Sequence, residues 1–146
     1  MSSLTMSNAG KVGQVADLVK AWPTRVAAAT LALAVAFIHV KDQGGLTVLR
    51  DPAYLGQGYR LLEIAGVVVA LVLLVLPSIP AWLLAGGVAL GPLVGFTLTR
   101  TVGLPNATDD VGNWGEAMGV AAVSVEFALL AIVWAVLVPW ITARRR

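Results

Sequence analysis

The sequence predicts an all-α protein, a four-helix transmembrane bundle with an N-terminal interfacial amphipathic helix. The first observation is composition: 58% of the 146 residues are hydrophobic and only 12% are charged. A soluble domain carries about 25% charged residues, so the composition argues against a soluble enzyme, a nucleic-acid-binding module and a disordered chain. The second observation is that the apolar residues form four long runs. Each run approaches the ~20 residues that cross a membrane.

The N-terminal segment, residues 1–22, is predicted to lie outside the bilayer. From Lys11 onward its apolar side chains recur at helical spacing and share one face, and they are Val12, Val15, Val19 and Trp22. Such an amphipathic helix lies on a membrane surface, and we expect it on the cytoplasmic side. The alternative is a docking helix for a cytoplasmic partner.

The transmembrane domain is expected over residues 23–146. Pro23 suits the first turn of a helix, where its missing N–H is not needed. The expected spans cover about residues 24–40, 59–76, 81–98 and 116–141. Only residues 77–80 separate the second span from the third, so these two form an antiparallel hairpin.

Two longer connections are rich in glycine and proline, over about residues 41–58 and 99–115. This composition is typical of turns rather than helix, and Gly56 and Gly58 are assigned to the first connection for that reason. Long ordered loops on a small scaffold often carry function.

The positive charges predict the orientation, because Lys and Arg accumulate on the cytoplasmic side of a membrane. Most of them precede the first span or follow the fourth, namely Lys11, Lys20, Arg25, Arg144, Arg145 and Arg146. Four spans return the chain to its starting side. We therefore expect both termini in the cytoplasm and both long connections outside.

The chain has no cysteine and one histidine. Disulfides, CxxC redox chemistry, cysteine-ligated iron–sulfur clusters and thiol nucleophiles are thereby excluded. A haem held by two histidines of this chain is excluded as well. We expect no catalytic residues and no cofactor, apart from a divalent metal ion considered below.

Four ionisable residues fall within the spans or at their ends: His39, Glu63, Arg100 and Glu126. Such a group costs about 2.5–3.5 kcal/mol at the centre of a membrane helix and indicates a function or a specific partner. Small residues share the helical faces of both glutamates and of the histidine, and such faces approach other helices. We therefore expect a polar pocket in the outer half of the bundle.

Several interpretations of this pocket remain open. In the first, Arg100 pairs with one or both glutamates, and the ion pair sets the helix register. In the second, His39, Glu63 and Glu126 bind a divalent metal ion, since imidazole and carboxylate suit zinc, iron or manganese. In the third, Glu126 is the proton- or cation-linked carboxylate of a carrier. A quinone or lipid pocket is a further alternative.

The third span also carries Gly87, Gly91 and Gly95, one helical turn apart. Repeated small residues at this spacing let membrane helices pack closely. We expect a helix-packing surface, either within the bundle or against another subunit.

The run from Arg100 to Pro105 (Arg-Thr-Val-Gly-Leu-Pro), together with His39, Trp114 and Glu126, resembles an uncharacterised family of small four-span integral membrane proteins of actinobacteria and related bacteria. The resemblance covers about residues 26–140. It implies a location in the bacterial plasma membrane and no particular activity.

The function expected from the sequence is that of a non-enzymatic integral membrane protein. It would serve as an accessory or assembly subunit of a larger membrane complex, or form a homo-oligomer. The alternative is a small carrier or a metal- or cation-binding protein that uses the polar pocket. Its expected partners are the lipid bilayer and other membrane subunits or further copies of itself, without nucleic acid.

Overall fold

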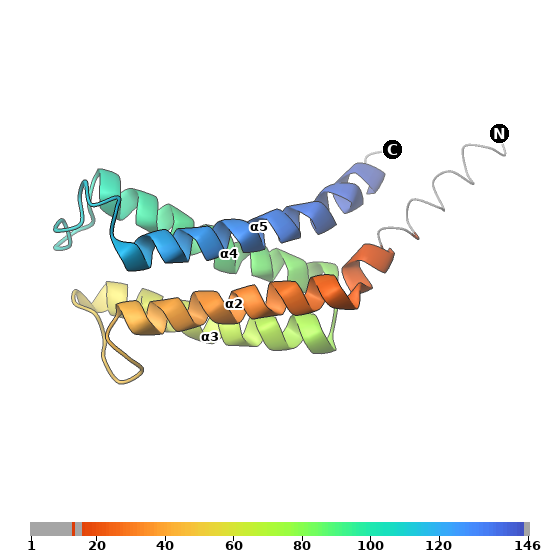
Figure 1. Ribbon diagram of the computed structural model, residues 1–146, viewed down its shortest axis with the longest axis horizontal. Coiled ribbons are helices and arrows are strands. Elements are labelled where there is room, and N and C mark those ends of the chain that lie inside the picture. The colour runs from red at the N-terminus through yellow and green to blue at the C-terminus, as the bar shows by residue number, and fades with distance from the viewer. Residues whose placement is uncertain (1–12, 14–15, 145–146) are drawn as a thin grey trace.

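The computed structural model describes residue 13 and residues 16–144, and it confirms the all-α fold class. Its long helices are α2 (Trp22–Asp42), α3 (Ala53–Val75), α4 (Ile79–Thr101) and α5 (Ala117–Arg144). Each is long and apolar enough to cross a membrane, α5 over Ala117–Thr142. The helices run side by side, and the loops 43–52 and 102–116 lie together at one end, which we name the loop end (Figure 1).

The second helix begins earlier than expected, at Ala53 instead of near Tyr59. The assignment of Gly56 and Gly58 to a turn was wrong, because both lie within α3. Gly56 serves a close approach: a Cβ atom there would lie 2.6 Å from the backbone oxygen of Arg50. Glycine at this position lets the preceding loop fold back against the helix.

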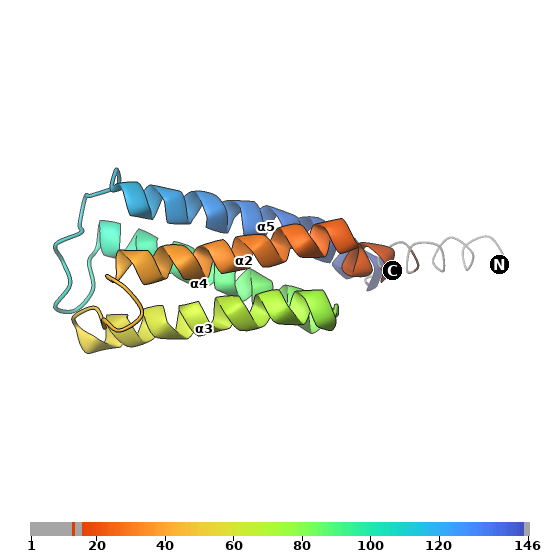
Figure 2. The same cartoon turned by 60° about the horizontal axis from the view of Figure 1, so that its bottom comes forward.

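The helices differ in how closely they pack. The largest interfaces are those of α2 with α3 and of α4 with α5, and α2 also packs on α5. The interface between α3 and α4 is smaller, although the two are consecutive. They are joined by residues 76–78 and move apart toward the loop end (Figures 1 and 2).

Small residues bring α2 and α3 together, as their spacing predicted. Ala28, Ala32 and Ala36 are buried on α2, and Gly66 and Ala70 are buried on α3. A Cβ atom on Gly66 would lie 2.8 Å from the backbone oxygen of Ala32. This close contact gives the pair its van der Waals packing.

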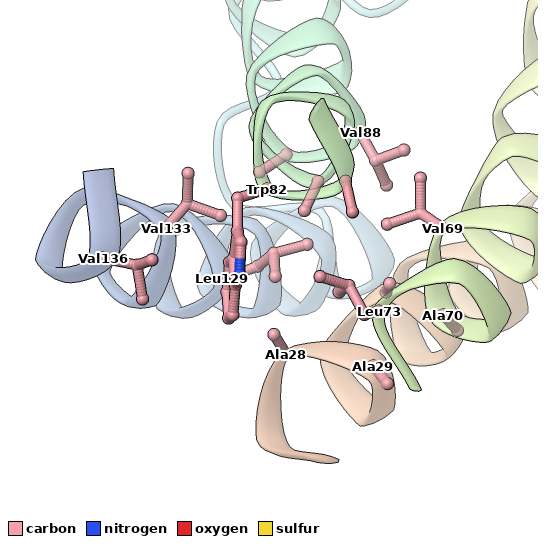
Figure 3. Packing of buried hydrophobic residues seen from close by; sticks show 14 of the residues in the cluster. Ala28, Ala29, Val69, Ala70, Leu73, Trp82, Val88, Leu129, Val133 and Val136 are labelled. Carbon is pink, nitrogen blue, oxygen red and sulfur yellow. The ribbon is translucent and has the colours of Figure 1, made fainter. Parts of the chain in front are cut away.

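The apolar core lies in the half of the bundle opposite the loop end, around the fully buried side chain of Trp82 (Figure 3). The indole N–H of Trp82 donates a hydrogen bond of 3.2 Å to the backbone oxygen of Val19. The helical residues 16–20 are thereby attached to this end of the bundle. Residues 11, 12, 14 and 15 of the predicted amphipathic helix lie outside the described residues.

A basic side chain joins α2 to the end of α3. The Nε atom of Arg25 donates a hydrogen bond of 2.7 Å to the backbone oxygen of Leu73, and its Nη2 atom donates to that of Leu74. The last carbonyl groups of a helix have no partner within the helix. Arg25 supplies donors to these carbonyls.

Candidate functional site

A cavity of about 860 Å³ runs between α3 and α4 from the loop end. It lies where these two helices have moved apart, away from their short connection. Residues of all four helices contribute to its wall. The wall is polar toward the loops. Between α3 and α4 it is apolar, lined by Leu61, Leu62, Ala65, Val69, Leu83, Leu84 and Val88.

Two of the predicted residues meet in this cavity. The Nε2 atom of His39 lies 3.7 Å from the Oε1 atom of Glu126. The two residues are 8% and 1% exposed, so water does not shield them. Glu126 lies nine residues after the first residue of α5, which is roughly 14 Å along the helix and near the middle of a bilayer.

The proton positions at this pair follow from its partners. The Nδ1 atom of His39 lies 2.8 Å from the backbone oxygen of Val35. A carbonyl oxygen only accepts, so Nδ1 carries a proton in either charge state of the ring, and Nε2 is an acceptor when the ring is neutral. Neither oxygen of Glu126 has a hydrogen-bond partner among the described residues. With the ring neutral and the carboxyl group ionised, two acceptors face each other across 3.7 Å.

Glu63 is in a different situation, and it does not line the cavity. Its Oε2 atom accepts a hydrogen bond of 2.8 Å from Nη1 of Arg60, and its Oε1 atom accepts one from the amide of Gln43. Both oxygens are satisfied although Glu63 is buried. Its contacts are structural: they tie the end of α2 to α3.

The interpretation in which Arg100 pairs with Glu63 or Glu126, one of several left open by the sequence, is wrong. The Nη1 atom of Arg100 lies 2.9 Å from Asp110, and its Nη2 atom lies 3.6 Å from Glu116. Arg100 stands at the last turn of α4, where the loop folds back over it. Gly112 donates a backbone hydrogen bond of 2.9 Å to the oxygen of Arg100, which brings Asp110 within its reach.

A second arginine, not predicted as a site residue, extends this cluster to the first loop. Arg50 lies 2.9 Å from Asp42 and 3.3 Å from Asp110, so Asp110 bridges Arg50 and Arg100. Burial by itself lowers the pKa of Arg50. Tyr59 and the neighbouring carboxylates together raise this pKa by more than burial lowers it, so the net shift is upward. The guanidinium therefore stays charged and holds the two loops together over the cavity.

Tyr59 links this cluster to the His39–Glu126 pair. Its hydroxyl group donates a hydrogen bond to Asp42. Its ring packs edge-on against the ring of His39, with the centroids 5.3 Å apart. The charges in the loops were visible in the sequence, but their spacing gives no sign of which carboxylate meets which arginine.

Among the described residues, no other helix packs against the glycine stripe of α4. No described atom outside their own helical surroundings lies within 4 Å of a Cβ atom built on Gly87, Gly91 or Gly95. The expected packing within the bundle is therefore wrong. All three glycines line the cavity instead.

The three residues of the predicted metal site do not all lie together. His39 and Glu126 lie together, whereas the oxygens of Glu63 are bonded to Gln43 and Arg60. In residues 13 and 16–144, no group of three or more His, Asp or Glu side chains is arranged to hold a metal ion. The metal site stays a prediction.

The chain matches no protein-family model, no curated protein and no solved structure. The resemblance to a four-span family therefore stays a prediction too. The apolar helices identify an integral membrane protein with four candidate spans.

Proposed function

We propose that this chain is a non-enzymatic membrane carrier that loads and releases a proton or a small cation between His39 and Glu126. One observation supports the proposal above all: a buried ring nitrogen and a buried carboxylate face each other inside the bundle without a hydrogen-bond donor between them. Two acceptors at this distance repel each other unless a proton or another cation lies between them.

A comparison of the two buried glutamates, Glu63 and Glu126, also supports the proposed carrier function. A buried ion that lacks a partner costs several kcal/mol. The described residues supply two donors to Glu63 and none to Glu126. Ionisable residues within membrane spans mark ion and proton pathways, and Glu126 is the glutamate that is left without a structural partner.

A route to the pair is provided by the cavity. Its polar part extends from Glu126 to the loop end, where Asp109 and Asp110 are among the lining residues. A cation that enters from this side meets carboxylates before it reaches the membrane interior. The ion pairs of Asp110 with Arg50 and Arg100 lie across this opening.

Proton loading is tested by infrared difference spectroscopy of the protein in lipid nanodiscs while the pH is changed. We expect a carboxylic-acid C=O band that disappears in Glu126→Gln and titrates differently in His39→Ala. The control is Glu116→Gln, which removes another cavity carboxylate, one that accepts backbone hydrogen bonds of 2.8 and 2.7 Å. A set of carboxyl bands that is the same in wild type and Glu126→Gln contradicts the proposal.

Transport is tested in liposomes that contain a pH-sensitive dye and carry a potassium diffusion potential. We expect proton flux in the wild type and none in Glu126→Gln, with Glu63→Gln, whose side chain does not line the cavity, close to wild type. Proton loading without flux would mean that the chain binds protons but does not carry them across the membrane.

A second candidate function is the accessory or assembly subunit. The observation that favours it is the open face of Gly87 and Gly91, which are exposed and have no neighbouring helix in the described chain. A helix of another subunit or of a second copy fits a face of small residues. Native mass spectrometry of the protein from its own membrane tests this function, because Gly91→Leu is expected to release any such subunit.

We also propose that the loop end faces outward from a bacterial plasma membrane and that both termini are cytoplasmic. The cations that flank the first and last spans support this orientation. Because the chain has no cysteine, a single Asn113→Cys variant can be labelled selectively. We expect a membrane-impermeant maleimide to label it in intact cells, and Ala16→Cys only after the cells are opened.

A further inference from the structure

The cavity is open to the side as well as toward the loops. Leu61 of α3 and Leu83 and Leu84 of α4 line it and are more than half exposed. Gly87 and Gly91, on the same side of α4, are exposed and have no side chain to close the gap. In a membrane this opening between α3 and α4 faces the lipid.

The opening is long enough to hold an extended alkyl chain. On α4 the lining residues extend from Leu83 to Arg100, which is roughly 25 Å along the helix. The part toward Leu83 is apolar, and the part toward Arg100 is polar. A ligand that fits both parts has a polar head and a long apolar tail.

The charge of the wall selects the sign of the head. Six carboxyl groups and two guanidinium groups line the cavity: those of Asp42, Asp51, Asp109, Asp110, Glu116, Glu126, Arg50 and Arg100. Both guanidinium groups are already paired with carboxylates. An anionic head would meet an excess of negative charge, whereas a cationic head is attracted.

The chemistry of the head follows from the two acceptors at the His39–Glu126 pair. Each acceptor lacks a donor, and a primary ammonium group carries several N–H donors on one atom. One N–H of such a group can point to Nε2 of His39 and another to Oε1 of Glu126. A quaternary ammonium group has the same charge and no donor.

We propose that the cavity binds a primary alkylammonium ion that arrives from the lipid between α3 and α4. Its ammonium group lies between His39 and Glu126, and its chain extends along α4 toward Leu83. This proposal rests on the proposed function, because it names the cation that the same pair takes up. The ammonium ion replaces the proton that the pair holds otherwise, so one proton is released to water for each cation bound, and the total charge is conserved.

The experiment measures binding to the protein in phosphatidylcholine nanodiscs by calorimetry, with proton release followed in weak buffer. The probe is octylammonium, and octyltrimethylammonium is the matched control without N–H donors. We expect octylammonium to bind with release of a proton, and the trimethyl ion to bind about tenfold weaker or not at all, because hydrogen bonds to charged groups are lost. Glu126→Gln is expected to weaken octylammonium binding by about thirtyfold or more.

Two further variants test the lateral opening. Gly91→Leu adds a side chain within the cavity and is expected to block octylammonium binding. Ala121→Leu adds a large side chain to an exposed position of α5 that does not line the cavity, and it should bind as the wild type does. Circular dichroism in the same nanodiscs checks that both variants are folded.

Three results overturn the inference. Equal binding of the two octyl ions shows that no N–H donor is recognised. Octylammonium binding that is unchanged in Glu126→Gln places the ion elsewhere in the protein or in the lipid. A Glu126-dependent infrared band without octylammonium binding refutes the alkylammonium alone and leaves the proposed function intact. Competition by phosphatidylethanolamine, whose headgroup is also a primary ammonium, supports the proposed recognition chemistry and assigns its source to a lipid headgroup.

Discussion

The guanidinium group of Arg100 contacts the carboxylate of Asp110, 2.9 Å away, and neither of the two glutamates buried in the bundle. The arginine at the end of α4 thus serves the loop that follows it. Asp110 in turn contacts Arg50 of the other loop at 3.3 Å. The same geometry that closes the two loops over the cavity leaves both oxygens of Glu126 without a hydrogen-bond partner among the described residues.

Replacement of Arg100 by leucine is expected to loosen the loop end without preventing insertion of the four spans. The change removes the contacts to Asp110 and Glu116, and we expect the free energy of unfolding in detergent to fall by about 1–2 kcal/mol. A double-mutant cycle with Asp110→Asn measures the coupling. Strict additivity of the two changes would show that the pair contributes nothing, and equal stability of Arg100→Leu and wild type would contradict the prediction directly.

Replacement of Glu126 by glutamine is expected to leave the free energy of unfolding within about 1 kcal/mol of the wild type or to raise it. Within the part of the chain that the structure describes, the side chain makes no hydrogen bond that the change could remove. A neutral group is also less costly to bury than an ion. Chemical unfolding in detergent measures the difference. A loss of several kcal/mol would mean that Glu126 is a structural residue.

The matched substitution Glu63→Gln is expected to act in the opposite direction. Its carboxylate holds Arg60 at 2.8 Å and also accepts from Gln43, so the change weakens a charge-assisted contact at the end of α2. We expect a loss on the order of 1–2 kcal/mol. If Glu63→Gln and Glu126→Gln shift the unfolding transition equally, the distinction drawn between the two glutamates is wrong.

Two glycine substitutions separate close packing from open space. In Gly66→Ala the new Cβ atom meets the backbone of α2 at 2.8 Å; backbone cannot rotate away, and we expect a loss on the order of 1–3 kcal/mol. In Gly91→Ala nothing lies within 4 Å of the new atom, and the higher helix propensity of alanine is expected to stabilise the helix by up to about 1 kcal/mol. Thermal unfolding of both variants in one detergent provides the comparison, and equal effects would contradict it.

The number of spans and the inward direction of the key side chains were already determined by the sequence. Hydrophobic length predicts a membrane helix, because an apolar run of sufficient length has a favourable place only in lipid. Helical periodicity then puts His39 above Ala28, Ala32 and Ala36, and all four are buried as that stripe predicts. Both are local properties of one helix, so they can be read without a partner.

The partners of the buried charges were decided only by the tertiary structure. Arg100 and Glu126 both occur in the sequence as unpaired charges, and nothing in their spacing says that the loop around Asp110 folds back and reaches Arg100 first. The same holds for Gly91, whose spacing within its stripe suggested tight packing. The short connection of α3 and α4 and their divergence place it against open space instead. Contacts between helices depend on their relative tilt and on the reach of loop side chains, and neither quantity is encoded in the periodicity of a single segment.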